Sequence, residues 1–531
     1  MQTVSTEWKD NHKKTLLNEA FVEVSLDIAD PDALADATSR DNGATYISNT
    51  PQVVSEVDNT VTPYSTLEQN IWVLDGSRKI IPLTDFGNNG FIGDVLSDEK
   101  CVFSSKTPLI TVSFTRVHSN IIPAVTIVWS RAYNEYAEEF LVTVYNGSNV
   151  VAQKEVLGNR SVESVVMMDI VDYDRITISV LKWCLPLHRA RVEEIFVGMR
   201  KVYSKSGLFS YNHSQTVDPV STSLPKAEIL FSVDNSDDSY NPYNDSSLSK
   251  YLMERQEVKS RYGHKLDDNT VEWIKGGTFY LYEWKAPQNG MTAEFTARDL
   301  LEFMFVEYKD NVTDITSRSL YNIAEEILTS LDLPLNNDGS RKWYLDESLK
   351  NIYTSAPLPV DSVANCLLLI ANTGCCTLYQ DRNGTLRIEP LGGEISNYTI
   401  NQFNSYSRAE TSLSKPLKEI AVKVYQYSIE DDEVKEETTE VIVPMGVNGE
   451  RVDVDNPLIT DNSRATTVGL WVGNYLKNRL TLETQWRPDV RLDALDTIKV
   501  NNDYSASDVR MTDVSYTFNG AFRGSGKGRV V

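Results

Sequence analysis

Short segments in which apolar and polar residues alternate recur along the chain, and a two-residue period is the pattern of strands buried on one face. The first such segment is residues 21–28, whose apolar side chains all fall on one side: Val22, Val24, Leu26 and Ile28. Between residues 64 and 200 similar segments follow one another, separated by turn residues such as Asn146-Gly147. Many short strands at this spacing predict a β-sandwich.

Helical periodicity occurs in three places. Ser319 is suited to an N-cap, and apolar residues at helical spacing follow it: Leu320, Ile323, Ala324, Ile327, Leu328 and Leu331. A second helix is predicted from near Asp361 to a stop at Gly374, and a third over residues 468–476. Gly469 and Gly473 in the third helix favour close packing. We therefore predict a mainly β chain with an α/β module.

Length and charge limit the classes of function. A single core rarely grows past about 250–300 residues, so the 531 residues predict several domains. Lys and Arg number 51 against 75 Asp and Glu, which gives a net charge of −24. Such an acidic surface repels phosphate, so we do not expect tight nucleic-acid binding.

The cysteines and the apolar runs indicate where the protein works. The five cysteines are odd in number and form no CxxC pair, so we expect neither a disulfide framework nor a zinc site. The N-terminal residues do not resemble a signal peptide, and no apolar run is long enough to span a membrane. We expect synthesis in a cytoplasm and no membrane insertion.

One loop could hold a metal ion. Residues 234–245 contain four aspartates, and calcium requires converging oxygen ligands: Asp234, Asp237, Asp238 and Asp245. The loop lacks the glycine at the sixth position of an EF-hand, which favours a solvated turn. The identity of any metal site therefore stays open at this point.

No motif predicts catalysis or cofactor binding. The five histidines lie far apart in the sequence: His12, His118, His188, His213 and His264. Residues 87–93 and 524–528 are glycine-rich but do not match a nucleotide-binding fingerprint or phosphate loop. The acidic pairs Glu138-Glu139 and Glu325-Glu326 are expected on solvated faces. We expect no catalytic residue, no cofactor and no enzymatic activity.

Several stretches resemble the hub and tail-associated proteins of long-tailed phages, especially those of Gram-positive hosts. These stretches are Leu224–Asn235, Trp273–Trp284, Ala293–Leu301, Ala356–Pro359, Leu378–Ile388 and Trp486–Ile498. The resemblance implies two hub β-barrels and an α/β connecting domain. The first barrel would comprise residues 1–60 and 201–300, the connecting domain residues 301–400, and the second barrel residues 401–531.

Residues 61–200 resemble a different fold, the galactose-binding-like jelly roll, inserted into the first barrel. The carrying segments are Phe140–Tyr145, Arg175–Leu181 and Ala190–Gly198. Such folds often bind sugars, but fold does not fix function. No sugar-binding cluster can be identified from the sequence.

The resemblance implies a homotrimeric structural subunit of the virion, assembled in the host bacterial cytoplasm. It would link the tail tube to the adsorption apparatus and contact the distal tail protein, the tape measure and fibres or a spike. DNA would pass through the channel of the trimer without specific binding. The alternative is an adhesin that binds a host surface glycan through the jelly roll. The sequence does not distinguish a phage from a phage-like injection machine, or a contractile tail from a non-contractile one.

Overall fold

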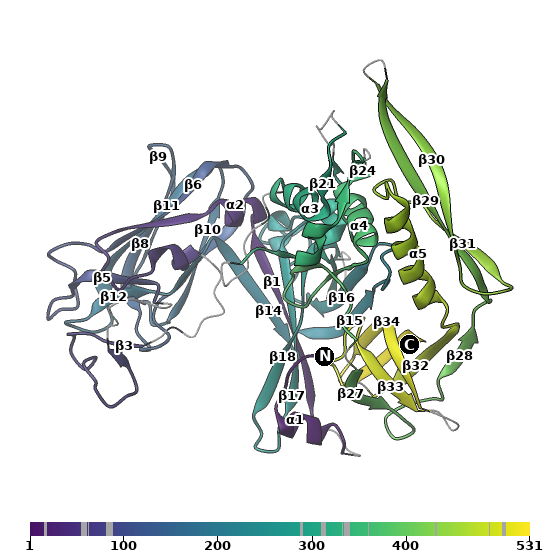
Figure 1. Ribbon diagram of the computed structural model, residues 1–531. Coiled ribbons are helices and arrows are strands. Elements are labelled where there is room, and N and C mark those ends of the chain that lie inside the picture. Colours follow the sequence, from purple (N-terminus) through teal and green to yellow (C-terminus); the bar gives the residue numbers. More distant parts are fainter. Residues whose placement is uncertain are drawn as a thin grey trace.

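The computed structural model describes the chain except residues 15–17, 55–60, 62, 81–88, 287–289, 309–314, 332, 334–339, 359–360, 394, 431–432, 488 and 502–505. The protein is mainly β, with 49% strand and 14% helix, as the alternating pattern predicts. Four hydrophobic cores are present in the described part of the chain. Figure 1 shows the sandwich on the left, the helices α3 and α4 at the centre, and the hairpin β29–β30 on the right.

The main sheet has 13 strands and combines two β units. The first unit contains β1 (Ala20–Ala29), β14 (Gly198–Ser204), β15 (Leu208–Thr216), β16 (Lys226–Asp234), β17 (Glu257–Lys265), β18 (Val271–Lys285) and β19 (Thr292–Arg298). The second unit contains β27 (Ile395–Ile400), β28 (Glu410–Leu413), β32 (Leu480–Trp486), β33 (Thr497–Asn501), β34 (Ala506–Phe518) and β35 (Phe522–Val530). Strand β15 pairs with β34, from Tyr211 opposite Phe518 to Thr216 opposite Asp513, so the backbone joins the two units.

The sandwich lies between β1 and β14 in the chain. Its five-stranded sheet contains β2 (Thr38–Asn42), β6 (Leu109–His118), β11 (Tyr173–Trp183), β8 (Ala137–Asn146) and β9 (Asn149–Val156). A three-stranded sheet contains β10 (Glu163–Ile170), β7 (Ile122–Val128) and β13 (Glu194–Phe196). Two short ribbons, β5 (Phe91–Leu96) with β12 (Arg189–Val192) and β3 (Tyr64–Ser65) with β4 (Lys79–Ile80), complete it. Alternating side chains fill its core, where the Trp129 and Trp183 ring centroids lie 6.1 Å apart.

The predicted sandwich boundary at residue 60 does not match the strand pairing. Strand β2 pairs with β6, so the five-stranded sheet already includes residues 38–42. At the other end, Ala29 of β1 lies opposite Gly198 of β14, which brings the two ends of the insert side by side. We therefore propose residues 30–197 as the inserted unit. The isolated polar strand β2 has no alternation that could have assigned it to either unit.

The connecting module contains the first two predicted helices, α3 (Leu320–Thr329) and α4 (Val363–Gly374). Ser319 caps α3 as predicted, because its side chain accepts a hydrogen bond from the Asn322 amide. Helix α4 is capped by Ser362 rather than Asp361, and Cys375 after it adopts a left-handed conformation. The small strands of this module are β20 (Glu307–Tyr308), β21 (Arg318–Ser319), β22 (Trp343–Leu345), β23 (Tyr353–Thr354), β24 (Asp361–Ser362), β25 (Thr377–Gln380) and β26 (Leu386–Glu389).

A hairpin and a helix interrupt the predicted second barrel of residues 401–531. Strands β29 (Leu417–Glu430), β30 (Glu433–Pro444) and β31 (Glu450–Val454) form a separate sheet against α5 (Asn462–Leu476). A Cβ on Gly469 would lie 2.7 Å from Val443, and one on Gly473 would lie 2.6 Å from Met445. The two glycines thus permit the close packing that the sequence indicated. The short helices α1 (Thr6–Asn11) and α2 (Pro31–Asp36) follow the N-terminus and β1.

Candidate functional site: an ionic cluster beneath a sandwich loop

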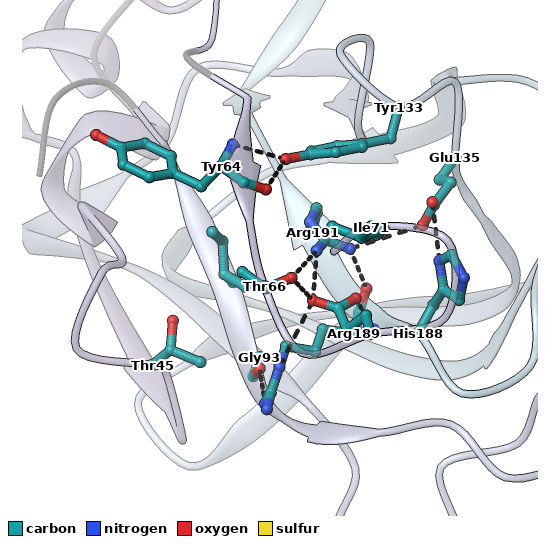
Figure 2. Close-up of polar contacts among 12 residues, drawn as sticks. Thr45, Tyr64, Thr66, Ile71, Gly93, Tyr133, Glu135, His188, Arg189 and Arg191 are labelled. Atoms are coloured by element: carbon teal, nitrogen blue, oxygen red, sulfur yellow. Dashed lines mark hydrogen bonds and ion pairs between the residues drawn. The ribbon is translucent and has the colours of Figure 1, made fainter. Parts of the chain in front are cut away.

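A buried ionic cluster holds the segment 64–80 against the sandwich (Figure 2). The fully buried Glu68 carboxylate accepts hydrogen bonds from Arg191 Nη2 at 2.6 Å, from the Arg189 amide at 2.9 Å and from Thr66. Burial alone would raise the pKa of Glu68, but the charge and hydrogen bonds of Arg191 outweigh it and lower that pKa. Glu68 is therefore an ionised anchor.

A second carboxylate, Glu135, completes the cluster from the other side. Trp183 Nε1 donates to one oxygen of Glu135 at 2.8 Å, and His188 Nδ1 lies 2.9 Å from the other. Arg191 Nη1 lies 3.7 Å from Glu135. Arg191 thus lies between two buried acids, Glu68 and Glu135, and Figure 2 shows its contact with Glu135. Pairing of this kind is what allows charges to be buried.

The cluster has no room for a substrate. The cavity beside it is lined by Tyr64, Thr66, Tyr133, Arg191 and Glu193 among others and measures about 10 Å³. That space is at the lower limit for one water molecule, about 10–15 Å³. The two carboxylates are already bound by Arg191 and their other donors, so the arrangement supports anchoring of the segment in preference to acid–base chemistry.

The anchored segment exposes apolar side chains, and we call them the loop surface: Leu67, Trp72, Leu74 and Ile80. Trp72 is 50% exposed and Leu67 77% exposed. Arg78 stabilises the backbone beneath, because it donates to the Ile71 carbonyl at 2.6 Å and lies over the Tyr133 ring. Exposed apolar side chains held by a rigid base are typical of a contact surface.

Three histidines are buried and individually partnered. His118 Nε2 lies 2.9 Å from Asp36, His188 bonds to Glu135, and His213 Nδ1 lies 2.8 Å from the Tyr262 hydroxyl. Burial lowers the pKa of His213 to about 3. These three histidines are thus buried side chains held by neighbours within the fold.

The other two histidines are brought together, which the sequence did not reveal. The rings of His12, just after α1, and His264, in β17, lie 4.5 Å apart. They are 252 positions apart in the sequence, and no local pattern links them. Among the described residues, no three His, Cys, Asp or Glu side chains form a group that could hold a metal ion.

The aspartates of residues 234–245 do not converge on a common point. Asp234 accepts from the Ser236 amide, Asp237 from the Ser239 amide, and Asp238 from Asn241. These are local turn bonds, as expected for a solvated loop. They give no support to a calcium site.

The remaining sequence motifs are accounted for by ordinary elements. Residues 524–528 lie within strand β35, and Gly93 lies within β5, while residues 87–88 are outside the described residues. Lys182 lies 3.0 Å from Glu138, and Arg341 lies 2.9 Å from Glu325. None of the five cysteines forms a disulfide in the described part of the chain. In the described part of the chain, no helix is long and apolar enough to cross a membrane.

Comparison with known proteins gives structural neighbours only. No family model matches the chain, and no curated protein matches it. The 43 kDa tail protein of prophage MuSo2 from Shewanella oneidensis is 11% identical, covers 62% of this chain and 94% of its own, and has a TM-score of 0.41. The E. coli c3393 protein, a component of the type VI secretion system, is 10% identical, covers 61% and 74%, and has a TM-score of 0.35.

A further neighbour is a lectin domain. The lectin domain of lectinolysin is 11% identical, covers 31% of this chain and 93% of its own, and has a TM-score of 0.20. Phage tail and baseplate proteins, which the sequence was expected to resemble, are thus among the solved structures similar to this chain.

Proposed function

We propose that this protein is a structural hub subunit of a phage tail tip or baseplate, which links the tail tube to the adsorption apparatus as a homotrimer. The observation that carries the proposal is the junction at which three parts of the chain meet around one buried side chain. A subunit that joins two parts of a machine has to transmit load, so its own parts must not rotate against one another.

The junction is built around Arg382, in the turn between β25 and β26 of the connecting module. Its guanidinium donates to Asp493 at 2.6 Å, to the Lys275 carbonyl at 2.8 Å, and to the Val490 and Leu492 carbonyls at 2.8 and 3.0 Å. Lys275 belongs to the first β unit, and the other three acceptors lie in the second. A buried cation with this many acceptors fixes geometry.

Two further contacts hold the β units together. The N-terminal ammonium of Met1, which precedes the first unit, lies 2.7 Å from Asp496 of the second. Both units also contribute side chains to one continuous core, in which the Tyr262 and Tyr516 ring centroids lie 6.1 Å apart. The backbone pairing of β15 with β34 adds to these contacts. Together these contacts favour one rigid body. We propose that its two β units occupy quasi-equivalent places, so that a trimer presents six of them to a six-fold tail tube.

The charge distribution fits a channel through which DNA passes. Figure 1 shows the hairpin β29–β30 extending away from the rest of the chain. Glu436, Glu437 and Glu440 are exposed on it. The net charge of three chains would be three times −24. An acidic lumen repels phosphate and lets DNA slide, and we propose that part of this acidity faces the channel.

The second candidate function is adhesion to a host surface glycan through the sandwich. The loop surface favours it, because exposed aromatic side chains such as Trp72 offer flat apolar faces to a ligand. The same side chains would serve equally well as a contact with a neighbouring tail protein. We rank the structural role first, because a protein that only binds a glycan does not need the rigid junction around Arg382.

The mass of the purified chain in solution tests the trimer. A homotrimer would have a mass of about 180 kDa, three times the 59.9 kDa of the chain. Light scattering at increasing concentration distinguishes it from a monomer. A particle of 59.9 kDa at every concentration, together with glycan binding by the isolated insert, would favour the adhesin instead.

A further inference from the structure

A pocket lies where the N-terminal segment, the first β unit and the second β unit meet. Its accessible volume is about 360 Å³. Its lining includes aromatic, imidazole and guanidinium side chains: Trp8, His12, His264, Tyr406, Arg487 and Phe522. The volume is within the range of small-molecule sites, about 300–1,000 Å³. The pocket lies away from the sandwich loop, and it shares only the backbone of Val490 with the proposed hub junction.

One wall of the pocket carries a buried polar atom that lacks a partner. His264 is only 3% exposed, and its Nε2 has no hydrogen-bond partner in the part of the chain that the structure describes. Buried ring nitrogens are normally paired, and an unpaired one destabilises the fold. The atom has almost no accessible surface, so a ligand oxygen must displace part of the lining to provide the missing partner.

The neighbouring groups favour an anionic oxygen. His12 stacks on Trp8 with ring centroids 5.3 Å apart, and its Nδ1 donates to the Trp8 carbonyl at 3.0 Å. Arg487, also in the lining, donates from Nη2 to the Lys14 carbonyl at 3.0 Å. Two imidazoles and a guanidinium thus border one cavity, and the N–H groups of the rings with the charge of Arg487 favour an anionic oxygen.

The acids near the pocket are already engaged by partners of their own. Glu19 lies 3.0 Å from Lys205, and Asp489 accepts from Arg491 at 2.8 Å. Glu272 accepts from the Ser5 amide, and Asp267 pairs with Lys14. These pairs reduce the negative potential that would oppose an anion.

We propose that the pocket binds a carboxylate attached to an apolar body. The carboxylate would accept hydrogen bonds from His264 Nε2 and from the cationic side of the lining, while the aromatic rings of Trp8, Tyr406 and Phe522 would contact the apolar body. Such a group can come from a free organic acid or from the C-terminal residue of a neighbouring protein chain, and both present the same chemistry.

The surroundings of His264 make binding dependent on pH. Burial lowers the pKa of His264 to about 4, and the nearby His12 lowers it further, while Asp489, Glu272 and Asp267 oppose the shift. The free pocket therefore holds a neutral His264 at pH 7. A bound carboxylate stabilises the protonated form and raises this pKa. Binding should take up protons, so affinity should increase as the pH falls from about 7.5 to about 5.5.

Calorimetric titration of the full chain with benzoate tests the proposal, with benzamide as the neutral isostere. We expect benzoate to bind at least about tenfold more tightly than benzamide, which is 1.4 kcal/mol. His264→Phe should abolish that preference, and Lys13→Gln, a change at an exposed neighbouring position, should preserve it. Equal binding of the two ligands, benzoate affinity unchanged in His264→Phe, or no benzoate binding at all would overturn the proposal.

Two further measurements keep the test decisive. If His264→Phe does not fold, the ¹⁵N shift of His264 in the unmodified protein replaces it; a shift that does not move towards the protonated form on addition of benzoate overturns the proposal. A dipeptide, N-acetyl-Gly-Phe, with a free terminus or with an amide, distinguishes the sources. Tighter binding of the free-terminus peptide than of benzoate assigns the pocket to a protein C-terminus, and the reverse assigns it to a free acid.

Discussion

The guanidinium of Arg382 and the carboxylate of Asp493 lie 2.6 Å apart, although 111 positions separate the two residues in the sequence. Arg382 belongs to the connecting module and Asp493 to the second β unit. Burial alone would lower the pKa of Arg382, but the charge of Asp493 outweighs it and raises that pKa, so the cation persists at any ordinary pH. This one pair, with the carbonyls around it, joins the connecting module to both β units.

Replacement of Arg382 by Met should destabilise the chain by about 3–5 kcal/mol, because it removes the ion pair with the half-buried Asp493 and leaves the Val490 and Leu492 carbonyls without this donor. Denaturant unfolding followed by tryptophan fluorescence measures this loss. Arg387→Met is the matched control on the same hairpin, where a more exposed arginine pairs with Asp381 at 2.9 Å, and it should cost less than about 1 kcal/mol. Equal losses in the two variants would show that the Arg382 junction has no special role.

Residues 30–197 should be removable as a unit. Ala29 and Gly198 are register partners on neighbouring antiparallel strands, so a short turn can replace the insert. We expect the shortened chain to keep its β-rich circular dichroism spectrum and its oligomeric mass. The isolated insert should fold alone, with a near-ultraviolet signal from Trp129 and Trp183. Aggregation of the shortened chain would contradict the proposed limits of the insert.

Stability should fall as the pH rises from about 4 to about 7 because of Asp299, a buried residue just before the 3₁₀ turn at Leu300–Met304. Burial raises the pKa of Asp299 to about 7. A folded-state pKa above the unfolded value contributes stability that is complete below about pH 4 and is lost as the pH rises to about 7, by up to about 4 kcal/mol. Asp299→Asn should flatten this part of the pH profile in thermal unfolding. An unchanged profile would mean that Asp299 is ionised in the folded protein.

Trp72→Ala should leave stability within about 0.5 kcal/mol, because half of the side chain is already exposed. Its effect on function separates the two proposed roles. If the loop surface binds glycan, the variant particle assembles but adsorbs poorly to host cells. If the loop surface contacts a neighbouring tail protein, tail tips are lost or reduced on electron micrographs. A variant that assembles and adsorbs normally would exclude the loop surface from both roles.

Local patterns predicted the local elements well. The Ser319 cap and the apolar stripe from Leu320 to Leu328 identify α3, because helix signals lie within a few residues of one another. The alternation in β6, β8 and β11 likewise identifies the sandwich. The same reasoning missed that β2 belongs to the sandwich, since its five polar residues carry no periodicity.

Long-range contacts could not be predicted from one sequence. Arg382 is one of two charged residues in a turn, and nothing local indicates that it is buried. The adjacency of His12 and His264 depends on the pairing of β1 with β17, which places Ala20 opposite His264. Glu68 and Arg191 are likewise 123 positions apart. In each case the order of the strands in the sheets brings the two residues together, and the two-residue period of the sequence does not encode that order.

The copy number and position of the chain in the assembled particle are the most direct test of the hub assignment. Electron cryo-microscopy of the complete tail should show three copies around the tail axis at the end of the tube, with both β units of each chain in one ring. The acidic hairpins should border the channel, and the inserts should project outwards. Six copies in a ring would point to a distal tail protein, and copies confined to lateral fibres would contradict the hub assignment.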